Sequence, residues 1–280
     1  MAKLLRFPGL TLAIVVVSCW LPMESAAQRR GVEGSFNRTL NVSGPVDLDV
    51  STGSGAIQIR QGAANRVEVI GRIRVGTERW RSDGDAGDLV RQIESNPPIE
   101  QNGNVIRIGR LEGRDFERNV SLSYDIIVPA QTAVNSNTGS GSITINDVSG
   151  RVKANTGSGS VMLRQTGSGD VDITTGSGSV EVSGVRGALR IHTGSGRITA
   201  QGEQTGRWDL ETGSGSVNIR LPENAGFDLD AHSGSGGVYV DHPITVQGRI
   251  ERRRSDVSGR VRGGGHALDV RTGSGSIRIE

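Results

Sequence analysis

The tetrapeptide Thr-Gly-Ser-Gly recurs through the chain and constrains its fold more than any other feature. Copies begin at Thr52, Thr138, Thr156, Thr166, Thr175, Thr193, Thr212 and Thr272, and a Ser-Gly-Ser-Gly copy begins at Ser233. The copy at Thr166 is predicted to occupy the opposite corner of its coil. The other copies from Thr138 to Ser233 start about 19 residues apart. The longer gap before Thr272 predicts two coils with one degenerate corner. A fixed period of this length indicates stacked repeats, each burying its apolar side against its neighbours.

Short runs of alternating apolar and polar residues flank the copies. Residues 171–174 and 189–192 come before a corner, and residues 180–182 and 217–219 come after one. Alternation with a period of two is typical of strands with one buried face. We therefore predict an all-β fold: a two-sheet parallel β-solenoid of about 19 residues per coil, with an N-terminal β cap that carries one short helix.

The glycines of the repeated motif are predicted to be structural corners. Glycine tolerates positive φ, and its missing side chain lets successive coils approach to the usual strand spacing of about 4.8 Å. The corner set is Gly139, Gly141, Gly157, Gly159, Gly176, Gly178, Gly194, Gly196, Gly213, Gly215, Gly273 and Gly275. The core columns expected between the corners are Val152, Val171, Leu189, Trp208, Phe227 and Leu268 in one sheet, and Ile143, Val161, Val180, Ile198, Val217 and Val238 in the other.

Residues 1–27 have the pattern of a signal peptide. Lys3 and Arg6 precede an apolar core, and small residues form a cleavage site before Gln28. The protein is therefore expected to be exported, to the periplasm, the outer surface or the medium. Cys19 follows a segment that resembles a lipobox, so a lipid-anchored protein is the alternative. It is the single cysteine of the chain, which leaves no partner for a disulfide.

The remaining chain is predicted to divide into an N-terminal β region, residues 28–118, and solenoid repeats, residues 119–280. An insertion at about residues 76–118 interrupts the first part. It contains a helix over residues 85–94 and a hairpin over residues 99–108, whose Asn-Gly pair is a strong two-residue turn signal. We expect the insertion to cap the terminal coil, because a solenoid must cover its open end.

Composition argues against nucleic acid as a partner. The formal net charge is +2, and aromatic residues make up 3% of the chain. Nucleic-acid binding normally requires a strongly basic surface, and base stacking requires aromatic platforms. No cofactor is predicted.

Charged residues that point outward are expected to stack into columns. Lys153, Asp172, Arg190, Asp209, Asp230 and Asp269 form one such column, which predicts a ladder of opposite charges that fixes the strand register. His192, Glu211 and His232 are expected on three consecutive coils of the next column, and two histidines with a carboxylate are a known zinc ligand set. The outer two would lie about 9.6 Å apart on a flat ladder, which favours an exposed charge ladder over a metal site. His242 and His266 are expected to be solvated in turns.

A cluster of arginines near the C-terminus is the strongest local charge feature. Its members are Arg249, Arg252, Arg253, Arg254, Arg260 and Arg262, placed around the expected degenerate corner. The cluster is interpreted either as a solvated face that blocks aggregation or as a ligand-binding patch for lipid phosphates, acidic glycans or an acidic partner. Residues 276–280 are expected to form an uncovered edge strand, which would permit end-to-end self-association.

An enzyme that acts on polysaccharides is the alternative to a binding module. Asp209 and Asp230 could serve as a carboxylate pair. Against this, aromatic subsites are scarce and no long insertion is present to wall a cleft. The chain is therefore predicted to be no enzyme and to have no catalytic residue.

The Thr-Gly-Ser-Gly corners, the G-P-V-D-L-D-V segment at residues 44–50 and the I-E-S-N-P-P-I-E-Q segment at residues 93–101 resemble a bacterial domain-of-unknown-function family called "putative adhesin". The resemblance covers residues 32–280. It implies a short-coil β-solenoid without catalytic residues. It also implies a non-enzymatic, adhesin-like surface or periplasmic interaction or scaffold module, whose partner is an envelope or surface glycan, lipid phosphate or protein.

Overall fold

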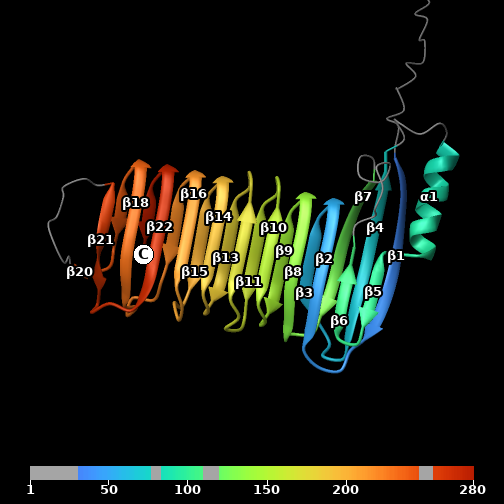
Figure 1. The fold of residues 1–280 in the computed structure, drawn as a ribbon, viewed down its shortest axis with the longest axis horizontal. Helices are drawn as coiled ribbons and strands as arrows, with labels where there is room; N and C mark the ends of the chain where they lie inside the picture. Colours follow the sequence, from blue (N-terminus) through green and yellow to red (C-terminus); the bar gives the residue numbers. More distant parts are fainter. Residues whose placement is uncertain (1–30, 77–82, 110–119, 246–254) are drawn as a thin grey trace, which may run out of the picture. The chain divides into compact units, whose positions relative to one another are not determined.

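The computed structural model describes residues 31–76, 83–109, 120–245 and 255–280. The expected signal peptide, Cys19, Arg249, Arg252, Arg253 and Arg254 lie outside these residues. Strands of the described part form two sheets, here called sheet A and sheet B, which face each other across a shared apolar core (Figure 1).

Sheet A contains eleven strands in the order β1-β4-β7-β3-β9-β11-β13-β15-β17-β23-β19. In chain order these strands are β1 (Val32–Asn41), β3 (Ile57–Gln61), β4 (Arg66–Val75), β7 (Val120–Val128), β9 (Ile143–Val148), β11 (Val161–Gln165), β13 (Val180–Val185), β15 (Ile198–Gly202), β17 (Val217–Arg220), β19 (Val238–Val240) and β23 (Ile277–Ile279).

Sheet B contains twelve strands in the order β20-β21-β18-β22-β16-β14-β12-β10-β8-β2-β6-β5. In chain order these strands are β2 (Val46–Ser54), β5 (Ile99–Asn102), β6 (Val105–Ile108), β8 (Thr132–Ser140), β10 (Val152–Thr156), β12 (Val171–Thr175), β14 (Leu189–Ser195), β16 (Trp208–Ser214), β18 (Phe227–Ser235), β20 (Ile244–Thr245), β21 (Asp256–Val261) and β22 (His266–Ser274).

Each coil contributes one strand to each sheet, and its neighbours pair with it in parallel. Along β14, for example, Leu189, Ile191 and Thr193 are buried while the residues between them are exposed. The column Val152, Val171, Leu189, Trp208 and Leu268 is in register, as is the column Ile143, Val161, Val180, Ile198 and Val217 in sheet A. The predicted two-sheet, mostly parallel β-solenoid is therefore confirmed.

One member of the predicted core column is misplaced. Leu229, and not Phe227, lies opposite Leu268, and Phe227 lies opposite His266. Phe227 is still buried, and its ring meets the ring of His242 edge to face with 5.6 Å between their centres. His242 is only 8% exposed, so the prediction that it is solvated was wrong.

The coils do not stack in the order of the sequence at the C-terminal end. The last coil, β22 with β23, lies between the coil of β16 and β17 and the coil of β18 and β19 (Figure 1). The predicted open edge at residues 276–280 is therefore wrong, since β23 has a neighbour on both sides. The predicted degenerate coil is also wrong: β21 runs antiparallel to β18, and β20 runs antiparallel to β21.

The N-terminal end shows the same kind of insertion. The coil of β2 and β3 lies between β6 and β7 on one side and β8 and β9 on the other. The predicted helix is present as α1 (Asp83–Ser95), which packs on β1 and β4. The predicted hairpin is present as β5 and β6, with Gly103 at a φ of 61° in its turn.

Side chains occupy some of the backbone groups on the open edge of β1. The N–H of Ser35 donates to the Glu94 carboxylate at 2.8 Å, and the Gln101 amide donates to the carbonyl of Asn41 at 2.7 Å. Arg38 donates to the carbonyl of Asn37 at 2.9 Å. An edge strand whose hydrogen-bonding groups are occupied is a poor template for another strand.

Candidate functional site

The corners lock neighbouring coils together through buried hydroxyl groups. Six corner threonines donate to the carbonyl of the last glycine of an adjacent corner: Thr138 to Gly55, Thr156 to Gly141, Thr175 to Gly159, Thr193 to Gly178, Thr212 to Gly196 and Thr272 to Gly215, at 2.8–3.1 Å. Thr52 donates to the carbonyl of Leu122 at 2.8 Å. This repeated bond explains why threonine recurs before the first glycine, because a buried acceptor without a donor is costly.

The corner glycines are required mainly by close approach. A Cβ placed on Gly178 would lie 1.8 Å from the carbonyl oxygen of Gly159, and one on Gly196 would lie 2.0 Å from that of Gly178. Of the predicted corner set, Gly275 alone has a φ between +20° and +160°. The expectation of positive φ was therefore wrong for the other corners, whereas the expectation of close coil contact is confirmed.

The outer face of sheet B carries the predicted charged column in a different order. Across the sheet the column runs Lys153, Asp172, Arg190, Asp209, Asp269, Asp230 and Ser258. The inserted strand β22 thus places Asp269 between Asp209 and Asp230. The three aspartates at the end of the column are neighbours, and Arg207 compensates their charge by an ion pair with Asp269 at 2.7 Å.

The predicted histidine–glutamate triad is not formed by consecutive strands. His192 contacts Glu211 at 3.3 Å, but Arg271 on β22 separates Glu211 from His232. A guanidinium in the middle of the row repels a cation. In the part of the chain that the structure describes, no group of three His, Cys, Asp or Glu side chains is arranged to hold a metal ion. The geometry assumed for a zinc site was therefore wrong.

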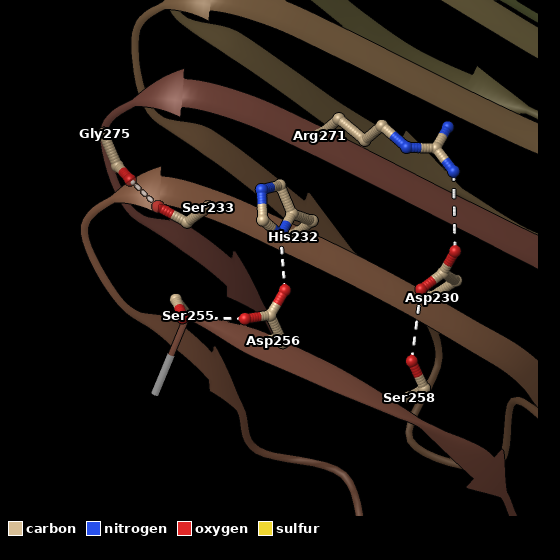
Figure 2. A network of polar contacts seen from close by, with 8 residues as sticks. All are labelled: Asp230, His232, Ser233, Ser255, Asp256, Ser258, Arg271 and Gly275. Carbon is tan, nitrogen blue, oxygen red and sulfur yellow. Dashed lines mark hydrogen bonds and ion pairs between the residues drawn. The ribbon is translucent and has the colours of Figure 1, made fainter. Parts of the chain in front are cut away.

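A polar network surrounds His232 at the end of sheet B (Figure 2). His232 Nδ1 contacts Asp256, and the Ser255 hydroxyl donates to the same carboxylate at 2.8 Å. In a serine-hydrolase triad the histidine lies between the serine and the aspartate. Here the aspartate lies between the other two, so the histidine cannot take the serine proton and the arrangement supplies no nucleophile.

The predicted carboxylate pair is also rearranged. Asp209 and Asp230 lie two strands apart, which corresponds to about 9.6 Å at the usual strand spacing. Asp230 accepts from Ser258 at 3.1 Å and from Arg271 at 3.4 Å (Figure 2). A catalytic pair requires about 5–9.5 Å with room for substrate, and the intervening Asp269 fills that room.

Two members of the predicted arginine patch lie in the described residues. Arg260 on β21 forms an ion pair with Asp228 at 3.6 Å. Arg262 is exposed in the turn after β21, where it has a φ of 48°. The other four arginines lie outside the described residues, so the ligand-binding patch stays a prediction.

A hollow on the outer face of sheet B was missed by sequence reasoning. It has a volume of about 340 Å³ and lies over β10, β12, β14 and β16, and its lining includes Ala188, Arg190, Asp172 and Asp209. The signal available in the sequence was Ala188 itself. The equivalent position in the other coils of this hollow carries a charged residue: Arg151, Asp170 or Arg207. A second hollow, of about 590 Å³, lies on sheet A over β1, β4 and β7 and is lined by serines, Arg72 and the Glu33–Arg74 ion pair.

Comparison with known proteins gives one family match and several distant structures. The family model described as Toastrack DUF4097 matches residues 102–280. No curated protein matches the chain. None of the described helices is both long and apolar enough to cross a membrane.

The solved structures share low sequence identity with this chain. A "putative cell adhesion protein" from Clostridium sporogenes is 14% identical, with 88% of this chain and 99% of that chain covered and a TM-score of 0.39. A "putative adhesin" from Bacteroides fragilis is 14% identical, with 88% and 97% covered and a TM-score of 0.41. A "putative lipid binding protein" from Parabacteroides distasonis is 13% identical, with 89% and 98% covered and a TM-score of 0.29.

Proposed function

This chain belongs to the Toastrack DUF4097 family, and we propose that it is a non-enzymatic, exported interaction module that binds an envelope or surface component through the outer face of sheet B. The pattern of a signal peptide in residues 1–27 supports export, with anchoring through Cys19 as the alternative form.

The observation that carries this proposal is the regular grid of side chains on that face. Successive strands of sheet B are in register, so each coil projects its polar residues about 4.8 Å from the equivalent residues of the next coil. Lys153, Arg190, Asp209 and Glu211 belong to this grid. A rigid, periodic and charged surface suits recognition of an extended partner, because its groups are held in place before binding.

The same face supports binding over catalysis. Its serine, histidine and aspartate at the C-terminal end are connected in an order that supplies no nucleophile. Of its aspartates, Asp269 is paired with Arg207, and Asp230 accepts from Arg271 and Ser258. Fixed ion pairs on a flat sheet stabilise register and specify a partner by charge complementarity.

Binding of the full exported chain to fractionated envelope components and acidic polysaccharides, at two salt concentrations, tests the proposal. The first variant is Asp172→Asn/Arg190→Gln/Asp209→Asn on sheet B. The matched control, Glu181→Gln/Arg197→Gln, removes charges from the outer face of sheet A. We expect the sheet B variant to bind at least about tenfold more weakly than the parent chain, and the control to bind as tightly as the parent chain.

A third variant, Arg252→Ser/Arg253→Ser/Arg254→Ser, examines the arginine cluster. Unchanged binding by this variant supports the sheet B face. Binding that the arginine variant abolishes and the sheet B variant retains would contradict the proposal and assign recognition to the arginines.

A further inference from the structure

The hollow above Ala188 interrupts the outer face of sheet B. Arg151, Asp170 and Arg207 directly precede β10, β12 and β16, at the position that Ala188 occupies before β14. The side chain of Ala188 ends at its Cβ and leaves space in this row, and the hollow as a whole has a volume of about 340 Å³. Pockets that hold small ligands begin at about this size.

The longer side chains of the same row also line the hollow, and each has a partner. Asp170 accepts the N–H of Ala188 at 3.1 Å and lies 3.8 Å from Arg151. Arg207 turns to Asp269, with 2.7 Å between nitrogen and oxygen. The row that contains Ala188 therefore contributes walls whose charges are already compensated.

The next row supplies charges that have no partner. Lys153, Asp172, Arg190 and Asp209 lie side by side on β10, β12, β14 and β16, with alternating sign. Within the described residues, none of these four side chains forms a hydrogen bond or an ion pair. Each is thus available to a ligand, and the four charges sum to zero.

This pattern selects a ligand that carries both signs. A simple anion at Arg190 would be repelled by Asp172 and Asp209 on either side, and a simple cation at Asp209 would be repelled by Arg190. A carboxylate and an ammonium group a few ångströms apart meet complementary charges on neighbouring strands, about 4.8 Å apart.

We infer that the hollow above Ala188 binds a small zwitterion, either a free amino acid or the amino-acid end of a larger molecule. The guanidinium of Arg190 receives the carboxylate through paired N–H donors, which suit the geometry of a carboxylate. Asp209 accepts from the ammonium group. This inference rests on the proposed function, because it names the chemistry recognised at one position of the same face.

The test is a titration of the full exported chain with three matched probes, followed by NMR chemical shifts. L-alanine carries both charges, N-acetyl-L-alanine lacks the ammonium charge, and L-alaninamide lacks the carboxylate. Because the hollow is open to solvent, we expect weak but saturable binding of L-alanine and at least about tenfold weaker binding of the other two. L-alanyl-L-alanine is added to separate the two sources: tighter binding than L-alanine assigns the site to a peptide end, and weaker binding assigns it to a free amino acid.

Three variants locate the site. Arg190→Gln and Asp209→Asn each remove one charge, and Ala188→Leu fills the hollow while it leaves every charge in place. All three should reduce L-alanine binding at least tenfold, whereas Glu181→Gln on sheet A should not. Equal binding of L-alanine and N-acetyl-L-alanine, equal binding of L-alanine and L-alaninamide, saturable binding that survives Ala188→Leu, or absence of binding would each overturn the inference.

Failure of this inference can be told apart from failure of the proposed function. If no probe binds but the sheet B variant still loses its envelope partner, the face is the binding surface and the hollow is not a zwitterion site. If L-alanine binds at the hollow but no variant of sheet B changes partner binding, the small-molecule site stands and the proposed function fails.

Discussion

The hydroxyl of Ser233 donates to the carbonyl of Gly275 at 2.7 Å, so the corner at Ser233 bonds to a corner that comes two repeats later in the sequence (Figure 2). Thr272, in the same corner as Gly275, donates in turn to Gly215 at 2.8 Å. These two hydroxyl bonds therefore connect β22 to β16 on one side and to β18 on the other, as expected for a last coil inserted between the two.

Disulfide trapping can test the inserted position of the last coil. Ser214 and Ser274 are exposed partners in register, and Ser274 separates Ser214 from Ser235. Neighbouring strands about 4.8 Å apart fall within the Cα range of a disulfide, and strands about 9.6 Å apart do not. With Cys19→Ser as the background, Ser214→Cys/Ser274→Cys should cross-link and Ser214→Cys/Ser235→Cys should not. Mass spectrometry of unreduced digests reads the result, and the reverse pattern would restore the sequential order of coils.

Glycine at the corners should be essential only where coils touch. A Cβ on Gly194 would lie 2.6 Å from the carbonyl oxygen of Gly176, whereas one on Gly53 would have nothing within 4 Å. Gly194→Ala should therefore lower the free energy of unfolding by about 1–3 kcal/mol through overpacking. Gly53→Ala, the same change at the same motif position, should stay within about 0.5 kcal/mol of the parent. Urea denaturation measures both, and equal effects would refute close approach as the cause.

The corner hydroxyls should contribute measurably to stability. Thr193 is fully buried and donates to Gly178 at 3.0 Å, so Thr193→Val preserves shape but leaves that carbonyl without its hydroxyl donor. We expect a loss of about 1–3 kcal/mol in the free energy of unfolding. Thr199→Val makes the same chemical change on the outer face of sheet A and serves as the control. A Thr193→Val protein as stable as the control would show that the ladder of hydroxyl bonds is dispensable.

Alkaline pH should unfold the N-terminal region through Tyr124. Its side chain is 1% exposed and donates to the carbonyl of Gly109 at 3.1 Å, and burial raises its pKa above the ordinary range. Because folding favours the neutral phenol, stability is unaffected below about pH 10, the pKa of an unfolded tyrosine, and falls as the pH rises further.

Absorbance of tyrosinate measures the ionisation of Tyr124 in a Tyr239→Phe variant, because the chain contains two tyrosines and this change leaves Tyr124 alone. The absorbance step should coincide with loss of β-sheet circular dichroism. Ionisation of Tyr124 near pH 10 with the sheets intact would contradict the proposed effect of burial.

Local patterns in the sequence were sufficient for the elements and their faces. Alternation in residues 189–192 predicts a strand with Leu189 and Ile191 inside, and the Asn102-Gly103 pair predicts the hairpin turn; both are observed. These signals act within a few residues of the chain, so they do not depend on which coil lies beside which.

The order of the coils could not be predicted, and the predictions for the charged column, the carboxylate pair and the histidine–glutamate triad failed because they depended on it. The corners at Thr212, Ser233 and Thr272 carry nearly the same motif, so each can donate to the others' glycines equally well. The triad of His192, Glu211 and His232 assumed sequential stacking, and the insertion of Arg271 removed it. The charged hollow was missed for a different reason. Ala188 marks it in the sequence, and alanine has no functional group that would draw attention to a site.

The inserted last coil also sets when the structure can be completed. Strands β18 and β19 join the rest of the solenoid through β22 and β23, and the other neighbour of β18 is β21, which also follows it in the chain. The ribosome therefore makes residues 227–240 before residues 266–279, the segment that connects them to β16 and β17. Until residues 266–279 have been synthesised, β18 and β19 cannot occupy their native positions on the solenoid.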